Sequence, residues 1–155
     1  MSWFNDFKEK LTQITVSPAG GEWAAIAMAC MVFADGKATD CEIESAQSSC
    51  TNNPVIVNSI GQAKALKIFD STTEVLKIVP QTMLESYEEK LQLLGKVVKK
   101  QQDKNYAFAT VVAIALADGN LTDSEREMLL RFKDYIKANV DVSILVDQSS
   151  KEEQA

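Results

Sequence analysis

The 155-residue sequence contains no histidine, six glycines, three prolines and three cysteines. The lack of histidine removes the side chain that most often acts as a general base, and also the usual partner of cysteine in zinc sites. The scarcity of glycine and proline, beside many alanine, leucine, lysine and glutamate residues, favours helix over sheet. The cysteines, Cys30, Cys41 and Cys50, show no C-x-x-C spacing, so we expect reduced thiols.

Basic side chains are outnumbered, with 16 Lys and Arg against 22 Asp and Glu, which gives a net charge of −6. A nucleic-acid-binding surface requires a basic stripe, so this balance argues against a nucleic-acid partner. An acidic chain is compatible with the binding of cations or of a basic protein surface.

The sequence also lacks long apolar runs, signal-peptide features and the motifs of common enzymes. Its uncharged runs fall short of the ~20 residues that a membrane-spanning helix needs, and the N-terminus has no signal-peptide pattern. We therefore expect a cytoplasmic protein. Because G-x-S-x-G, P-loop and Rossmann patterns are also missing, we expect no enzymatic activity; a metal-dependent hydrolase using clustered carboxylates is the less favoured alternative.

One eleven-residue pattern occurs twice, at residues 34–44 (ADGKATDCEIE) and 117–127 (ADGNLTDSERE). Besides the leading alanine, six residues match at a constant separation of 83 positions: Asp35 with Asp118, Gly36 with Gly119, Thr39 with Thr122, Asp40 with Asp123, Glu42 with Glu125, and Glu44 with Glu127. Each copy follows an uncharged, alanine-rich run, at 24–33 and 107–117. Such a repeat predicts one domain built from two related halves, each an apolar helix, an Asp-Gly turn and an acidic helix start.

Most of the repeated motif is explained by helix capping. The glycines follow apolar helices, where a residue in the left-handed conformation commonly ends a helix. Thr39 and Glu42, like Thr122 and Glu125, have the spacing of a capping box, in which the hydroxyl and the carboxylate each accept a backbone N–H bond. Asp40 and Asp123 place negative charge in the first turn, which the helix dipole stabilises.

Asp35 and Asp118 are not explained by capping, because a negative charge at the C-terminal end of a helix is disfavoured by the dipole. Their repetition predicts a positive charge nearby, which is either a Lys or Arg side chain or a divalent cation. Each aspartate precedes a glutamate of its own copy by seven residues across a tight turn. Asp35 with Glu42, and Asp118 with Glu125, could therefore converge on one hard cation.

We predict an all-α, single-domain bundle of about seven helices with an internal duplication. The predicted helices lie at 2–16, 22–34, 40 to about 52, 55–60, from 72 with a kink or division at Pro80, 85–101, 105–117 and 123–138. Residues 17–21 are predicted as a loop, Ser71 as a helix cap, and Asp103 as the cap of the helix at 105–117. We expect residues 1–18 to form an N-terminal helix and loop, 19–145 the helical domain, and 146–155 a disordered tail.

The N-terminal helix is amphipathic and carries Trp3, Phe4 and Phe7 near the free end. Its favoured role is to fold back over the core. The alternative is peripheral contact with a membrane, here the inner face of the cytoplasmic membrane, through residues 2–16.

The duplicated A-D-G-x-x-T-x-x-E motif, the alanine-rich helices before it and the stretch LKIFDSTTEVL at 66–76 resemble the TerB tellurite-resistance family and the wider TerB-like superfamily. The likeness runs from about residue 20 to 140. It implies an all-helical fold with an internal repeat, and a module without enzymatic activity that acts with membrane-bound and calcium-binding Ter partners in tellurite and stress resistance.

The resemblance also implies an acidic patch that binds divalent cations, with Ca²⁺ favoured and Mg²⁺ or Zn²⁺ as alternatives. By motif position, the candidate metal ligands are Asp35, Glu42, Asp118 and Glu125, followed by Asp40, Glu44, Asp123 and Glu127. The alternative function is a structural adaptor whose acidic patch binds a basic protein partner without metal.

Overall fold

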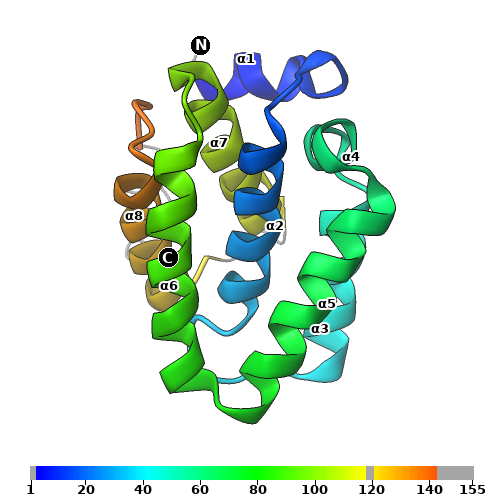
Figure 1. Ribbon diagram of the computed structural model, residues 1–155, viewed down its shortest axis with the longest axis vertical. Coiled ribbons are helices and arrows are strands. Elements are labelled where there is room, and N and C mark those ends of the chain that lie inside the picture. The colour runs from blue at the N-terminus through cyan, green and yellow to red at the C-terminus, as the bar shows by residue number, and fades with distance from the viewer. Residues whose placement is uncertain (1–2, 118–120, 143–155) are drawn as a thin grey trace, which may run out of the picture.

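The computed structural model describes residues 3–117 and 121–142, which form eight α-helices and one 3₁₀ helix without a strand (Figure 1). The elements in chain order are α1 (Trp3–Glu9), η1 (Leu11–Gln13), α2 (Pro18–Val32), α3 (Asp40–Thr51), α4 (Pro54–Ile60), α5 (Gln62–Ile78), α6 (Pro80–Val97), α7 (Gln101–Ala117) and α8 (Asp123–Ile136). The all-α prediction is confirmed, with eight α-helices in the described part of the chain instead of about seven.

Helix α2 is the central element, and it contacts α3, α4, α5, α6, α7 and α8. Figure 1 shows it between α5 and α6, with α7 beside it. Its sequence is apolar on every face, and its residues from Gly20 to Met31 are buried except for Glu22. A helix without a polar face needs neighbours on all sides, so the other helices surround it.

The predicted loop at 17–21 is wrong, because α2 begins at Pro18. Proline suits the first helical position, where its missing N–H leaves no bond unmade, and the Ser17 hydroxyl accepts a bond from the Gly20 N–H at 3.4 Å. Gly21 then allows close approach of α4, since an added Cβ would lie 2.6 Å from the Cβ of Ser59.

The duplication predicted from the sequence is visible in the helix boundaries. Helix α2 begins at residue 18 and α7 at 101, while α3 begins at 40 and α8 at 123, so both pairs of starts are 83 residues apart. Helix α7 begins four residues before its predicted start, and Asp103 lies buried in its first turn instead of capping it. A carboxylate in that turn is stabilised by the helix dipole.

The predicted helix start at Ser71 is also wrong, because α5 runs unbroken from Gln62 to Ile78. The hydroxyls of Ser71 and Thr72 donate to the Ile68 carbonyl at 3.1 and 2.8 Å, bonding back within the helix instead of capping a new one. Of the kink and the division predicted at Pro80, the structure shows the division. Pro80 starts α6, which therefore begins five residues before the predicted position 85.

The N-terminal helix is shorter than the predicted 2–16, because α1 ends at Glu9 and only a 3₁₀ turn follows at Leu11–Gln13. It folds back over the core, as its favoured role predicted. Phe4 and Phe7 of α1 are 5% and 2% exposed, and the Phe7 ring lies 5.8 Å from that of Tyr106 in α7. Membrane contact through these rings would require α1 to leave the bundle. None of the helices in the described residues has the length and apolar character needed to cross a bilayer, and the predicted tail at 146–155 lies outside those residues.

We expect the substitution Gly95→Ala to destabilise the fold. Gly95 is buried in α6 where α8 crosses it, and an added Cβ would collide with the Tyr135 carbonyl oxygen and lie 3.0 Å from the Ile136 Cα. Because backbone atoms cannot rotate away, we expect a loss of about 1–3 kcal/mol in the free energy of unfolding, measured by urea denaturation. Ser86→Ala, at an exposed position of α6, is the control; equal stability of the two variants would contradict this packing.

Candidate functional site: the groove between the two motifs

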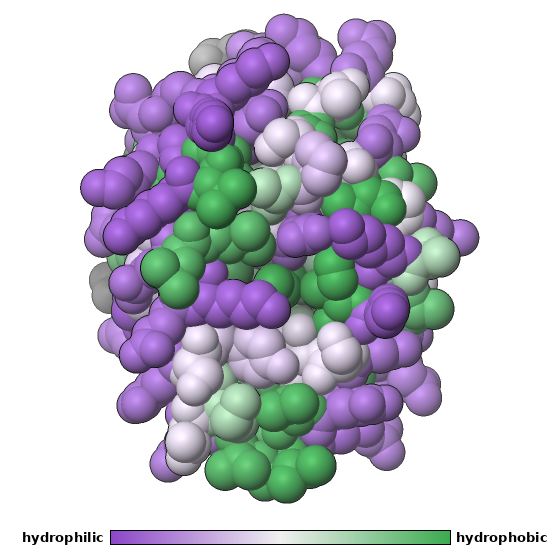
Figure 2. Space-filling model, viewed as in Figure 1, coloured by the Kyte–Doolittle hydropathy of each residue, from purple (hydrophilic) through white to green (hydrophobic). Residues whose placement is uncertain are grey.

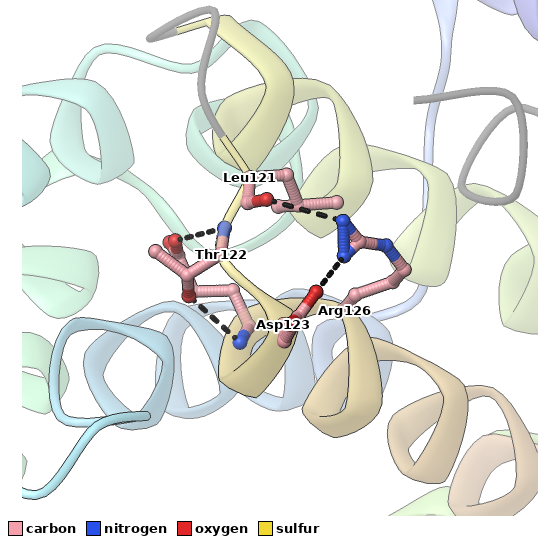
Figure 3. Close-up of polar contacts among 5 residues, drawn as sticks. Leu121, Thr122, Asp123 and Arg126 are labelled. Carbon is pink, nitrogen blue, oxygen red and sulfur yellow. Dashed lines mark hydrogen bonds and ion pairs between the residues drawn. The ribbon is translucent and has the colours of Figure 1, made fainter. Parts of the chain in front are cut away.

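Both predicted capping boxes are confirmed. At the start of α3, the Thr39 hydroxyl accepts the Glu42 N–H at 3.1 Å, and Glu42 Oε1 accepts the Thr39 N–H at 2.9 Å. At the start of α8, Thr122 and Glu125 exchange the same two bonds at 3.1 and 3.0 Å (Figure 3). Each glutamate therefore has one carboxylate oxygen bonded to backbone and a second that this box leaves available.

The glycine of the first motif has the predicted positive φ, at 92°, but it does not directly follow the helix. Helix α2 ends at Val32, and the Gly36 N–H donates to the Phe33 carbonyl at 2.9 Å to close a further turn. Asp35 therefore lies in this turn and is exposed. The corresponding Asp118 and Gly119 lie outside the described residues.

A protein cation lies beside each first-turn aspartate. Asp123 pairs with Arg126 at 2.8 Å, and the same guanidinium donates to the Leu121 carbonyl at 3.4 Å (Figure 3). Asp40 pairs with Lys77 of α5 at 3.3 Å. Since both aspartates are largely exposed, the two ion pairs contribute little to stability.

Arg126 is not among the functional residues predicted from the sequence, although alignment of the two motif copies points to it. Its position in the second copy corresponds to Ile43 in the first, and both side chains are buried, at 8% and 7% exposure. An arginine that replaces a buried isoleucine brings a positive charge into the acidic motif itself. The second copy thus carries a counter-charge that the first copy lacks at this position.

The two motif copies border one cavity of about 300 Å³, which we call the motif groove. Its acidic rim is formed by Asp35, Glu42 and Glu125, three of the four leading candidate ligands. The remaining lining comes from the C-terminal ends of α2 and α7, the turn after α2, the first three turns of α3 and the N-cap of α8: Met28, Met31, Val32, Ala34, Cys41, Ser45, Ala46, Ser49, Ile114, Ala115 and Thr122. The groove thus combines a largely apolar floor with negative charge at its edge.

None of the second group of candidate ligands, Asp40, Glu44, Asp123 and Glu127, lines this groove. Asp40 and Glu44 line a separate cavity of about 350 Å³ between α3 and α5, together with Asp70, Glu74 and Lys77. Asp123 faces Arg126, and Glu127 is exposed and lines neither cavity. The structure therefore separates the acidic side chains that the motif places close together in sequence.

Residues 3–117 and 121–142 contain no group of three or more Cys, Asp or Glu side chains placed to hold one metal ion. The three rim carboxylates share a cavity without forming a coordination shell. The hydrogen bond from the Thr39 N–H, followed by the interaction with the Thr39 side chain, lowers the pKa of the Glu42 carboxyl from its ordinary value. Both interactions favour the ionised form of the carboxyl. An acidic rim around an apolar floor is suited to a ligand with both a positive charge and an apolar portion.

Comparison of the chain with protein-family models, with curated proteins and with solved structures finds no match. The resemblance to the TerB family, and the ligands and partners that it implies, therefore stay predictions.

We expect Thr39→Ala and Thr122→Ala each to lower the free energy of unfolding by about 1 kcal/mol at pH 7, because each removes the hydroxyl that caps a helix. Urea denaturation measures the change, and Thr82→Ala at an exposed position of α6 serves as the control. Thr39→Ala should also raise the Glu42 pKa toward its ordinary value, measured by NMR titration.

The sign of the pH dependence follows from the lowered Glu42 pKa. A carboxyl with a lower pKa in the folded state stabilises the fold at pH values above its unfolded pKa, and this contribution is lost as the pH falls through the folded pKa. The stability difference between the unsubstituted chain and Glu42→Gln should therefore disappear on acidification. If the difference in stability persisted unchanged at acidic pH, it would contradict a stabilising role for the ionised Glu42 carboxylate in the capping box.

Proposed function

We propose that this chain is a non-enzymatic interaction module whose motif groove binds a basic segment of a partner protein. The observation that carries the proposal is the joint placement of Asp35, Glu42 and Glu125 at the rim of one apolar-floored cavity. Arginine and lysine side chains have an apolar stem and a charged end. The stem would lie on the methionine and isoleucine side chains of the floor, and the charged end would meet the rim carboxylates.

The chemistry of the groove favours arginine as the bound side chain. A guanidinium can donate two parallel hydrogen bonds to one carboxylate, whereas an ammonium acts as a point charge. Met28 and Met31 in the floor can adapt to different apolar stems, because the methionine side chain is unbranched and flexible. A cavity of about 300 Å³ is at the low end of small-ligand sites and suits one or two long side chains of a peptide.

The test is a fluorescence-polarisation titration of the full chain with a labelled peptide of alternating leucine and arginine residues. We expect the triple variant Asp35→Asn, Glu42→Gln, Glu125→Gln to bind at least about tenfold more weakly, a difference of about 1.4 kcal/mol. Glutamine keeps the capping-box geometry, so the loss would reflect charge at the groove and not an altered fold.

A charge-matched triple variant provides the control: Glu44→Gln, Glu127→Gln and Asp134→Asn remove three exposed carboxylates that do not line the motif groove. Binding by this variant should stay within about twofold of the unsubstituted chain, since surface charges away from the contact are screened by salt. Equal weakening in both triple variants would show attraction by net charge alone and would refute a site in the groove.

The second candidate function is the binding of a divalent cation, with Ca²⁺ ahead of Mg²⁺ and Zn²⁺. Its support is that Asp35, Glu42 and Glu125 border the same cavity, because carboxylate oxygens are the ligands that the hard cations Ca²⁺ and Mg²⁺ prefer. A membrane-bound Ter partner and a role in tellurite or stress resistance are proposed on the resemblance alone. A cytoplasmic location is proposed on the lack of a signal-peptide pattern and of long apolar runs in the sequence.

Calorimetric titration of the metal-free protein tests the cation proposal. We expect binding of Ca²⁺ that disappears in Glu42→Gln, Glu125→Gln. Because glutamine preserves the geometry of both caps, this variant should stay folded without the ion and lose only the stabilisation that comes from the ionised Glu42 carboxyl. Neither heat nor a thermal shift at millimolar Ca²⁺, Mg²⁺ or Zn²⁺ would exclude the cation. The peptide titration, performed with a chelator present, decides separately whether a basic partner binds without metal.

A further inference from the structure

A second groove lies on another face of the bundle, between α5 and α6 and above α2. It encloses about 610 Å³ and is lined by Glu22, Ile26, Ala63, Lys64, Lys67, Ile68, Ser71, Thr72, Tyr87, Lys90 and Leu94. Figure 1 shows α5 and α6 diverging from the corner at the bottom of the view, with α2 between them. Figure 2 shows hydrophobic surface in this region, crossed by hydrophilic side chains. We call it the α5–α6 groove.

The floor of the α5–α6 groove is apolar. Ile26 of α2 lies at its base, Ile68 of α5 and Leu94 of α6 form its sides, and Ala63 leaves room near one end. On α6 the apolar surface continues past the groove, because Leu93 and Val97 are 64% and 57% exposed. These two residues follow Lys90 at helical spacings of three and seven, which places all three along one side of the helix.

The rim of the α5–α6 groove is basic although the whole chain carries a net charge of −6. Lys64 and Lys67 come from α5 and Lys90 from α6, so lysines stand on both walls. The only carboxylate in the lining, Glu22, pairs with Lys64 at 2.7 Å. Within the described residues, Lys67 and Lys90 form no ion pair, so their charges are available to a ligand.

We propose that the α5–α6 groove binds an amphipathic helix of another protein that carries carboxylates along the edges of its apolar face. Two helical walls and a helical floor leave the position that an additional helix takes in a bundle, and such grooves bind the apolar face of a partner helix. Lysines on both walls select acidic flanks and repel basic ones, which sets the orientation and identity of the partner. This groove lies apart from the motif groove, and the proposal is independent of what the motif groove binds.

The test uses two labelled 18-residue model helices with identical leucine faces, one flanked by glutamate and one by lysine. In fluorescence polarisation with the full chain carrying Asp35→Asn, Glu42→Gln and Glu125→Gln, which removes the charge of the motif groove, we expect only the glutamate helix to bind, and its affinity to fall as salt screens the charges. The variant Lys67→Glu, Lys90→Glu should bind it at least about tenfold more weakly, a difference of about 1.4 kcal/mol.

The control variant Lys99→Glu, Lys100→Glu makes the same change in net charge at exposed positions outside the groove, and it should bind normally. NMR chemical-shift changes in the unsubstituted chain should fall on α5, α6 and Ile26. No binding of either helix, equal binding of both, equal weakening in both variants, or shifts confined to the motif groove would overturn the proposal. Binding to phosphatidylglycerol vesicles but not to the glutamate helix would also overturn it and assign the groove to an anionic membrane surface.

Discussion

The burial of α2 between Gly20 and Met31, interrupted only at Glu22, is the constraint on which the rest of the bundle depends. Because this helix has no polar face, every side of it must be covered, and six other helices contact it. Trp23 is an example of this close packing. Its ring is fully buried, and its indole N–H donates to the Leu91 carbonyl of α6 at 3.1 Å. A buried indole N–H needs such a partner, so packing and hydrogen bonding fix α6 against α2 together.

The motif groove is a consequence of the same packing. Helices α2 and α7 are the apolar members of the two repeated units, and they contact one another. The last turns of both helices line the groove. Because α3 begins soon after α2 in the chain, and α8 soon after α7, the starts of α3 and α8 reach the same groove. The repeat therefore creates a site that neither copy forms alone, and the glutamates that cap α3 and α8 also supply its charge.

The bundle presents two grooves of opposite character. Two of the three carboxylates at the acidic rim of the motif groove, Glu42 and Glu125, lie at helix starts, where they cap the backbone and are stabilised by the helix dipole. The α5–α6 groove has a basic rim carried on the sides of two helices, where long lysine side chains can reach over an apolar floor. Two separate surfaces with different charge and similar apolar floors are what an adaptor between two partners requires.

Local interactions account for what could be predicted from the sequence. The capping boxes at Thr39 and Thr122 depend on bonds between residues three positions apart. The errors arose where a local signal was outweighed by continuation of a helix. Ser71 and Glu74 have capping-box spacing, but the Ser71 hydroxyl bonds back to Ile68 because α5 already extends through this point from Gln62.

The sequence by itself determined the all-helical class, the two capping boxes and the duplication, because each depends on periodicity or on contacts within one turn. Only the tertiary structure decided which carboxylates meet. Glu42 and Glu125 lie at one groove although 83 positions separate them, whereas Glu44 lies at another although it is two residues from Glu42. Helix geometry turns residues two positions apart toward different sides, and the packing of distant helices sets what each side faces.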